Sequence, residues 1–282
     1  MSTQIATLKE KALAQRQKSK PIEELIKKSV NELGKALPAH LNAERLVRIA
    51  LTTLRLNPGL ADCTPESFLG ALFQAAQLGL EPNIEGQAYL IDYNNSKKVG
   101  NEWIKIKEVQ FQIGYKGYIT LFYRHELALS IEVRTVFEKE EFEYAYGTSP
   151  FIKHIPKLKD KGEPIAFYVV AKLKNGATLF NVMSIEDCIE HGKKHSKTFD
   201  KTKKEFDKNS PWVKDRDAMC KKTVLIQIMK LLPKSVEMQK ALAMDNTTKS
   251  KIDIDMFNIK DETNWNDDEI IDLERGDNNE QI

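Results

Sequence analysis

The apolar residues in the first part of the chain recur with a helical period and are interrupted by clear breakers. The helices predicted from this pattern cover residues 5–19, 22–37 and 43–56. A further helix is expected to begin after Thr64, because threonine is a good N-cap and Pro65 suits the first helical position. Its apolar positions continue to Ala76, and Gly79 ends it.

After this helix the apolar period changes from 3.6 to 2, which indicates strands. Residues 88–93 and 109–113 alternate, and the polar segment Asn94–Lys107 between them predicts a hairpin with a long tip. The glycine-rich sequence 114–118 then leads into a short helix ending near Arg124. Further strands are predicted at residues 127–137, 165–173 and 177–183, the last two joined by a turn at Asn175-Gly176.

The last third of the chain is predicted to be helical and strongly basic. Ser184 is a suitable N-cap for the first of these helices. A turn at residues 209–211 precedes a long helix from Trp212 to about Leu232, which is charged in its first turns and apolar on most sides later. A short helix at 236–244 follows. Residues 245–282 are acidic with few core-forming side chains, and we expect them to be largely disordered alone.

Composition limits the class of protein. The 282 residues are 41% apolar, enough for a substantial core, and no apolar run approaches the roughly 18 residues of a membrane span. Residues 1–20 are polar and basic, unlike a secretory signal. Three widely spaced cysteines favour a reducing compartment over a disulfide framework. We therefore expect a soluble, cytoplasmic protein.

The net charge of +2 conceals alternating blocks. Residues 1–56 carry +6, residues 57–150 carry −5, residues 151–240 carry +9 and residues 241–282 carry −8. This asymmetry indicates a basic surface for a polyanion together with an acidic tail. The alternative is a well-solvated surface on which the charges are unevenly spread.

Several classes of enzyme lack their signatures in this sequence. It has no phosphate loop G-x-x-x-x-G-K-[ST], no G-x-S-x-G elbow and no Glu-x-Lys or Gln-x-Lys triplet of a large nuclease class. Cys188, His191 and His195 share one predicted helix at offsets of three and four, so a metal site is conceivable. No further ligand stands at matching spacing, and a basic surface helix with a buried cysteine is the competing interpretation. We expect no metal and no cofactor.

The evidence for nucleic-acid binding is stronger. Proteins that bind single strands combine a cationic groove with aromatic or extended polar side chains, and both kinds of residue gather around residues 89–118. At the turn, backbone N–H groups of Gly114 and Gly117, with the positive end of the following helix, could hold a phosphate, although many such turns are simple punctuation. Residues 193–222 add 11 basic and 5 acidic groups, which form either a polyanion surface or a solvated helix.

Several blocks of this sequence closely resemble the RecT family, in the same order and with compatible spacing over roughly residues 40–245. The blocks are Cys63-Thr64-Pro65-Glu66-Ser67, Ala75-Ala76-Gln77-Leu78-Gly79-Leu80-Glu81-Pro82, Ala88-Tyr89-Leu90-Ile91, residues 109–118 (VQFQIGYKGY), Trp212-Val213-Lys214, residues 218–224 (AMCKKTV) and residues 235–241 (SVEMQKA). Several blocks in register are far more specific than any one of them.

The resemblance implies a phage or prophage recombination protein that coats single-stranded DNA and anneals it to its complement without ATP. It implies an α+β fold in which a bent antiparallel sheet with a β-hairpin is backed by a long helix. It further implies rings or filaments with DNA in a basic groove, and a partner exonuclease. Annealing makes no covalent bond, so we expect no enzymatic activity. The competing function is passive single-strand DNA binding without annealing.

The residues expected to contact DNA lie on the glycine turn and the basic helices. They are Gln112, Tyr115, Lys116, Lys193, Lys194, Lys197, Lys214, Arg216, Lys221 and Lys222. Each has a structural alternative: Tyr115 packs in the core, or Arg216 forms a solvated ion pair with Asp215 or Asp217. The length of 94–107 sets this chain apart from the compact hairpins associated with many family members.

Three regions are expected along the chain. Residues 1–40 form a basic helical region suited to oligomer contacts, residues 41–245 form the annealing core, and residues 246–282 form an acidic flexible tail. In the tail, the apolar residues are spaced for a short amphipathic helix on a partner, such as the exonuclease or the host single-strand binding protein; they are Trp265, Ile270, Ile271 and Leu273. An acidic solubilising tail that competes with DNA is the alternative.

Overall fold

The computed structural model describes residues 17–39, 41–99, 102–196, 198–245, 247–248 and 262–263. The chain folds as two compact units. The first comprises Met1–Ala76, Leu90–Gln112 and Met244–Ile282, and the second comprises Gln77–Tyr89 and Ile113–Ala243. Within the described residues, no helix is long and apolar enough to cross a membrane.

The first unit is built from short helices that bury their apolar faces. In chain order they are 17–28, α2 (Val30–Ala36), α3 (Ala43–Leu56), the 3-10 helix η1 (Pro58–Asp62) and α4 (Pro65–Leu78). The Asn42 side chain caps α3 by accepting a hydrogen bond from Glu44 N at 2.7 Å. The predictions for 43–56 and for the helix after Thr64 are confirmed, and Gly79 (φ +57°) ends α4. Residues 5–16 of the first predicted helix lie outside the described residues.

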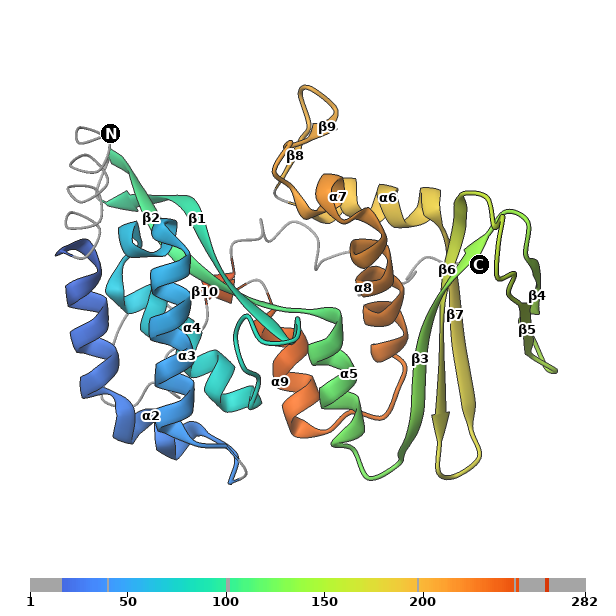
Figure 1. Cartoon of the computed structure of the whole chain (residues 1–282), viewed down its shortest axis with the longest axis horizontal. Helices are drawn as coiled ribbons and strands as arrows, with labels where there is room; N and C mark the ends of the chain where they lie inside the picture. Colours follow the sequence, from blue (N-terminus) through green and yellow to red (C-terminus); the bar gives the residue numbers. More distant parts are fainter. Residues whose placement is uncertain are drawn as a thin grey trace, which may run out of the picture. The chain divides into compact units, whose positions relative to one another are not determined.

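A long hairpin formed by β1 (Ala88–Val99) and β2 (Glu102–Ile113) follows (Figure 1). Where β2 meets α4, Val109 N donates a hydrogen bond to Ser67 Oγ at 2.9 Å. The prediction of a long tip at Asn94–Lys107 is wrong, because both strands run through this segment. The reason is that Glu102–Lys105 are all exposed, so this half of β2 has no buried face to produce an alternating pattern.

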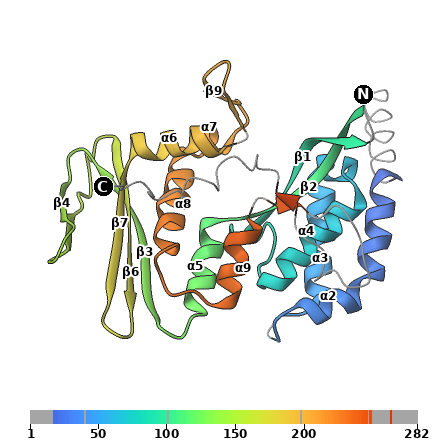
Figure 2. The same ribbon diagram turned by 180° about the vertical axis from the view of Figure 1, so that it is seen from behind.

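The second unit contains an antiparallel sheet in the order β3-β6-β7, formed by β3 (Ala128–Phe137), β6 (Pro164–Leu173) and β7 (Thr178–Ser184). Register shifts at both ends of the β3–β6 pairing bend it. Helix α8 (Arg216–Met229) contacts all three strands, and α5 (Tyr115–Tyr123) packs beside it (Figure 2). The α+β class with a bent antiparallel sheet backed by a helix is confirmed.

One helix predicted in the second unit differs from the structure. Helix α6 (Ile185–His195) has Ser184 as its N-cap, as expected, and α9 (Val236–Met244) is also present. The single long helix predicted from Trp212 is wrong, because α7 (Pro211–Lys214) and α8 are separate helices. Asp215 stands between them with φ −146°, and its carboxylate caps α8 by accepting a hydrogen bond from Ala218 N at 3.4 Å.

Two hairpins in the second unit were not predicted. One pairs β4 (Glu141–Ala145) with β5 (Phe151–Ile155), and the other pairs β8 (Phe199–Asp200) with β9 (Glu205–Phe206). In the first unit, β10 (Thr247–Thr248) pairs with β11 (Glu262–Thr263).

Candidate nucleic-acid interface

The two glycines at the start of α5 allow two backbone segments to approach closely. A Cβ atom on Gly114 would lie 2.0 Å from Gly86 O, and one on Gly117 would lie 2.1 Å from Gln87 O. Any larger residue would therefore collide with the main chain of the 84–87 turn.

The phosphate-holding role proposed for the amides of these glycines is not supported. Gly114 N donates a hydrogen bond to Gln87 O at 2.9 Å, and Gly117 N donates to Gly114 O at 3.0 Å. The first amides of α5 itself belong to Tyr115 and Lys116, and they have no acceptor within the helix.

The three residues expected to bind DNA near this turn have different surroundings. Gln112 is half-buried at the end of the first unit, where its Nε2 donates a hydrogen bond to the hydroxyl of Tyr93 at 3.2 Å. Burial raises the pKa of Tyr93, although the bond to Gln112 opposes this rise. In the second unit, Tyr115 is half-buried and Lys116 is exposed. Lys116 is thus the most accessible of the three.

On α6 the basic residues gather in the last turn. Lys193 forms an ion pair with Glu190 one turn earlier, and Lys194 is exposed. Cationic side chains at this end also interact favourably with the helix dipole. Lys197 lies outside the described residues. The opposite face of α6 is buried through Cys188 and Gly192.

The remaining predicted residues lie on α7 and α8. Lys214 is exposed at the end of α7, and Arg216 forms an exposed ion pair with Asp217 at 3.4 Å. Lys221 and Lys222 are half-buried on α8, while the neighbouring side chains of this helix are buried against the sheet. The buried residues are Cys220, Thr223, Val224, Leu225, Ile228 and Met229. Basic side chains therefore lie at the surface of an anchored helix.

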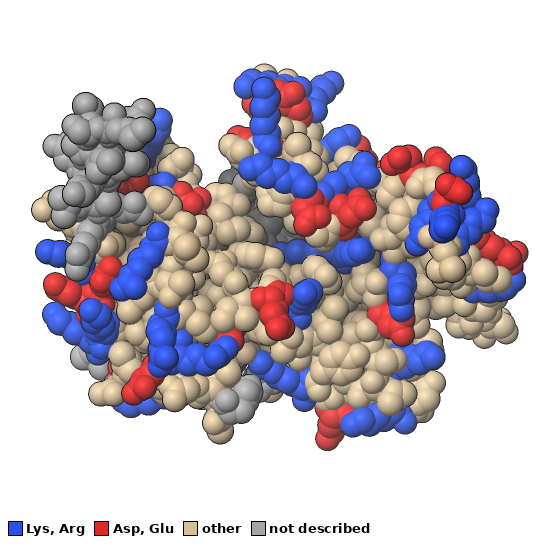
Figure 3. Space-filling view, in the orientation of Figure 1, with Lys and Arg blue, Asp and Glu red and all other residues tan. Residues whose placement is uncertain are grey.

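The β8–β9 hairpin adds basic residues that are not among the DNA contacts predicted from the sequence. Lys201, Lys203 and Lys204 occupy its turn, and Lys208 follows β9. Figure 3 shows Lys and Arg side chains gathered over this hairpin. The clue in the sequence is Asp200, whose carboxylate accepts hydrogen bonds from Thr202 N and Lys203 N, as aspartate does at the start of a tight turn.

The surroundings of Cys188 and His191 on α6 bear on the metal site that their spacing suggested. Cys188 is buried, and its thiol faces Cys220 O at 4.0 Å. Burial, with a smaller effect from the neighbouring His195, lowers the pKa of His191 to about 4. Within the described part of the chain, no three His, Cys, Asp or Glu side chains gather closely enough to hold a metal ion.

Comparison with known proteins identifies the family. The family model described as "RecT family" matches residues 44–264. Protein RecT of Escherichia coli (strain K12) is 38% identical over 223 residues, which cover 79% of this chain and 78% of that protein. The uncharacterized protein YqaK of Bacillus subtilis (strain 168) is 32% identical over 173 residues, or 59% of this chain and 56% of that protein. The chain therefore belongs to the RecT family, whose members are DNA-binding recombination proteins that anneal single strands.

Proposed function

We propose that this chain coats single-stranded DNA and pairs it with its complement without ATP, a metal centre or a covalent intermediate. The observation that carries the proposal is the placement of basic side chains on α6, α7 and α8. They lie at or near the surface, while the same helices bury Cys188, Trp212 and Cys220 in the second unit. A rigid core thereby presents cations to solvent.

This arrangement suits annealing chemically. Lysine and arginine neutralise phosphates without reading base edges, so the strand is held while its bases remain available for pairing. Base pairing then supplies the specificity. The proposed DNA contacts are Gln112, Tyr115, Lys116, Lys193, Lys194, Lys197, Lys214, Arg216, Lys221 and Lys222.

The experiment is the pairing of two complementary fluorophore-labelled strands, with EDTA and without ATP, across a salt series. We expect the protein to accelerate pairing strongly at low salt and Lys221→Ala/Lys222→Ala to lose most of the acceleration. Lys172→Ala/Lys174→Ala is the matched control, because it removes two exposed lysines from the β6–β7 hairpin of the same unit. Strands that are bound but pair no faster than without protein would favour passive coating instead.

The wider assembly is part of the proposal. We infer that the protein acts in the bacterial host cytoplasm as a homo-oligomeric ring or filament beside a 5′-to-3′ exonuclease. In this scheme residues 1–40 serve oligomer contacts, residues 41–245 form the annealing core, and the acidic residues 246–282 reach the exonuclease or the host single-strand binding protein. Trp265, Ile270, Ile271 and Leu273 of the last segment lie outside the described residues.

A further inference from the structure

The β8–β9 hairpin carries a cluster of lysines that we call the lysine tip: Lys201, Lys203, Lys204 and Lys208. All four side chains are exposed. Residues 193–214, which surround the tip, contain eight lysines and three carboxylates. The stretch includes the last turn of α6 and all of α7, and the hairpin lies between these two helices in the chain.

The hairpin is too short to be stable alone, because each strand has two residues. It is held by a row of aromatic rings. Phe199 and Phe206 lie edge to face with centroids 5.0 Å apart, and Phe206 stacks on Trp212 at 5.6 Å. Trp212 in turn lies against Gly192 of α6, where a Cβ atom would come within 2.6 Å of the indole ring.

Hydrogen bonds close the base of the hairpin. Asp207 N donates to Thr198 O at 2.8 Å, and the hydroxyls of Thr198 and Ser210 lie 2.6 Å apart. Ser210 is 2% exposed and also caps α7 by accepting a hydrogen bond from Trp212 N. The hairpin that carries the lysine tip therefore packs on α6 and α7.

Of the three carboxylates in residues 193–214, Asp200 and Asp207 accept hydrogen bonds from main-chain amides, whereas Glu205 is exposed. Asp200 accepts from Thr202 N at 2.8 Å and from Lys203 N at 3.1 Å, and these bonds lower its pKa. Lys203 Nζ approaches Asp200 at 3.8 Å, whereas Lys201, Lys204 and Lys208 pair with no carboxylate among the described residues. The turn is therefore stabilised while its cations stay available.

The chemistry of the tip fits a polyanion better than a protein surface. No large apolar side chain is exposed between Lys201 and Lys208, and lysine is depleted in protein interfaces. A lysine ammonium is a compact point charge that binds phosphate without a fixed geometry. We propose that the lysine tip binds the sugar–phosphate backbone of single-stranded DNA, independently of base sequence. This inference rests on the proposed function and adds residues to it.

The test compares wild type with Lys201→Ala/Lys204→Ala/Lys208→Ala, which leaves Asp200, Lys203 and the aromatic rings intact. The measurement is fluorescence anisotropy of labelled oligo-dT and of a mixed-sequence strand, from about 50 to about 200 mM salt. The slope of log K against log salt is negative, and each lost phosphate contact lowers its magnitude by roughly 0.7 for a single strand. For the three lysines together we expect the magnitude of the slope to fall by about 2, and by the same amount for both strands.

The matched control is Lys139→Ala/Lys157→Ala/Lys159→Ala, which removes three exposed lysines elsewhere in the second unit. An unchanged slope in the tip variant, or an equal loss in the control, overturns the inference. A tip variant that loses self-association but keeps its DNA affinity also overturns it, in favour of a protein contact.

Failure of the tip and failure of the proposed function give different results. If wild type accelerates pairing and the tip variant binds normally, only the tip inference fails. If wild type binds without accelerating pairing and the tip variant still loses its salt slope, the annealing proposal fails and the tip inference stands.

Discussion

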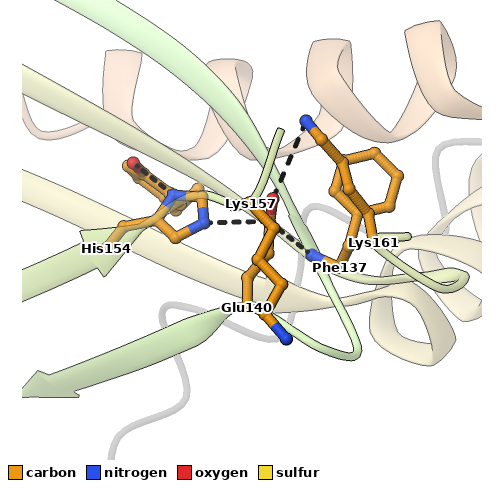
Figure 4. Close-up of polar contacts among 6 residues, drawn as sticks. Phe137, Glu140, His154, Lys157 and Lys161 are labelled. Carbon is orange, nitrogen blue, oxygen red and sulfur yellow. Dashed lines mark hydrogen bonds and ion pairs between the residues drawn. The ribbon is translucent and has the colours of Figure 1, made fainter. Parts of the chain in front are cut away.

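The carboxylate of Glu140, at the base of the β4–β5 hairpin, accepts hydrogen bonds from two main-chain amides and also contacts the side chains of His154 and Lys161 (Figure 4). Oε2 accepts from Phe137 N at 3.0 Å and faces His154 Nε2 at 3.0 Å. Oε1 accepts from Lys157 N at 3.1 Å and lies 3.7 Å from Lys161 Nζ. The side chain is 1% exposed, so water does not substitute for these partners. We predict that Glu140→Gln releases the hairpin.

The expected loss of stability follows from the contacts that the two oxygens of the carboxylate make. An amide keeps one acceptor oxygen and turns the other into an NH₂ group, which then faces the N–H of either Phe137 or Lys157. One main-chain bond and one side-chain contact are lost, and a buried N–H is left unsatisfied. Hydrogen bonds to a charged group contribute about 1.5–3 kcal/mol each, while the neutral amide is less costly to bury than a carboxylate. We therefore expect a net loss of about 3 kcal/mol.

The assay is hydrogen exchange of the β4 and β5 amides, with thermal unfolding alongside it. If the hairpin opens by itself, a loss of about 3 kcal/mol speeds its exchange roughly 100-fold. If the whole unit responds, the Tm falls by roughly 5–10 °C. Glu143→Gln is the control, because Glu143 is exposed on the same strand and should change stability by less than about 0.5 kcal/mol. Unchanged exchange together with an unchanged Tm in Glu140→Gln would contradict this prediction.

Three further predictions concern the pH dependence of Glu140 and substitutions at two other positions. Burial opposes ionisation of Glu140, but its hydrogen bonds prevail and hold the pKa below the ordinary value. The contribution of Glu140 to the free energy of unfolding should therefore be complete above the pKa that it has in the unfolded chain. It should be lost as the pH falls through the lower pKa of the folded state. Acid unfolding of Glu140→Gln should lack this loss. Gly114→Ala should destabilise by at least about 3 kcal/mol in denaturant unfolding, since its Cβ meets Gly86 O at 2.0 Å, and a wild-type midpoint would contradict this. Asn42→Ala should cost about 1 kcal/mol, whereas Asn42→Asp should retain the cap of α3.

Helices with local start and stop signals were predictable from the sequence. Asn57-Pro58-Gly59 follows α3, and Thr64-Pro65 opens α4, so both ends are encoded within a few residues. The β6–β7 hairpin was found for the same reason, because Gly176 adopts φ +88° in its turn. Such signals require no knowledge of distant parts of the chain.

The β4–β5 hairpin was missed because its stabilising contacts are distant in sequence. Phe142 stacks on Tyr168 of β6, with ring centroids 5.4 Å apart. Tyr146 stacks on Phe180 of β7, and its hydroxyl accepts a hydrogen bond from Val182 N at 3.0 Å. A periodicity of apolar positions within 141–155 cannot reveal partners that lie 26 to 36 residues later.

The candidate site shows the same division between local and distant information. Composition alone located the basic stretch 193–222, since charge needs no folding partner to be recognised. Composition did not show that Asp200 caps a turn or that Asp215 caps α8. It also did not show that Trp212 supports the β8–β9 hairpin by stacking on Phe206. The carboxylates of Asp200 and Asp215 remain charged, but because they bond to main-chain amides they leave most of the neighbouring lysine side chains without an ion pair to any described carboxylate. Net charge predicts that a polyanion binds, and the hydrogen bonds of the nearby carboxylates decide which lysines are left to bind it.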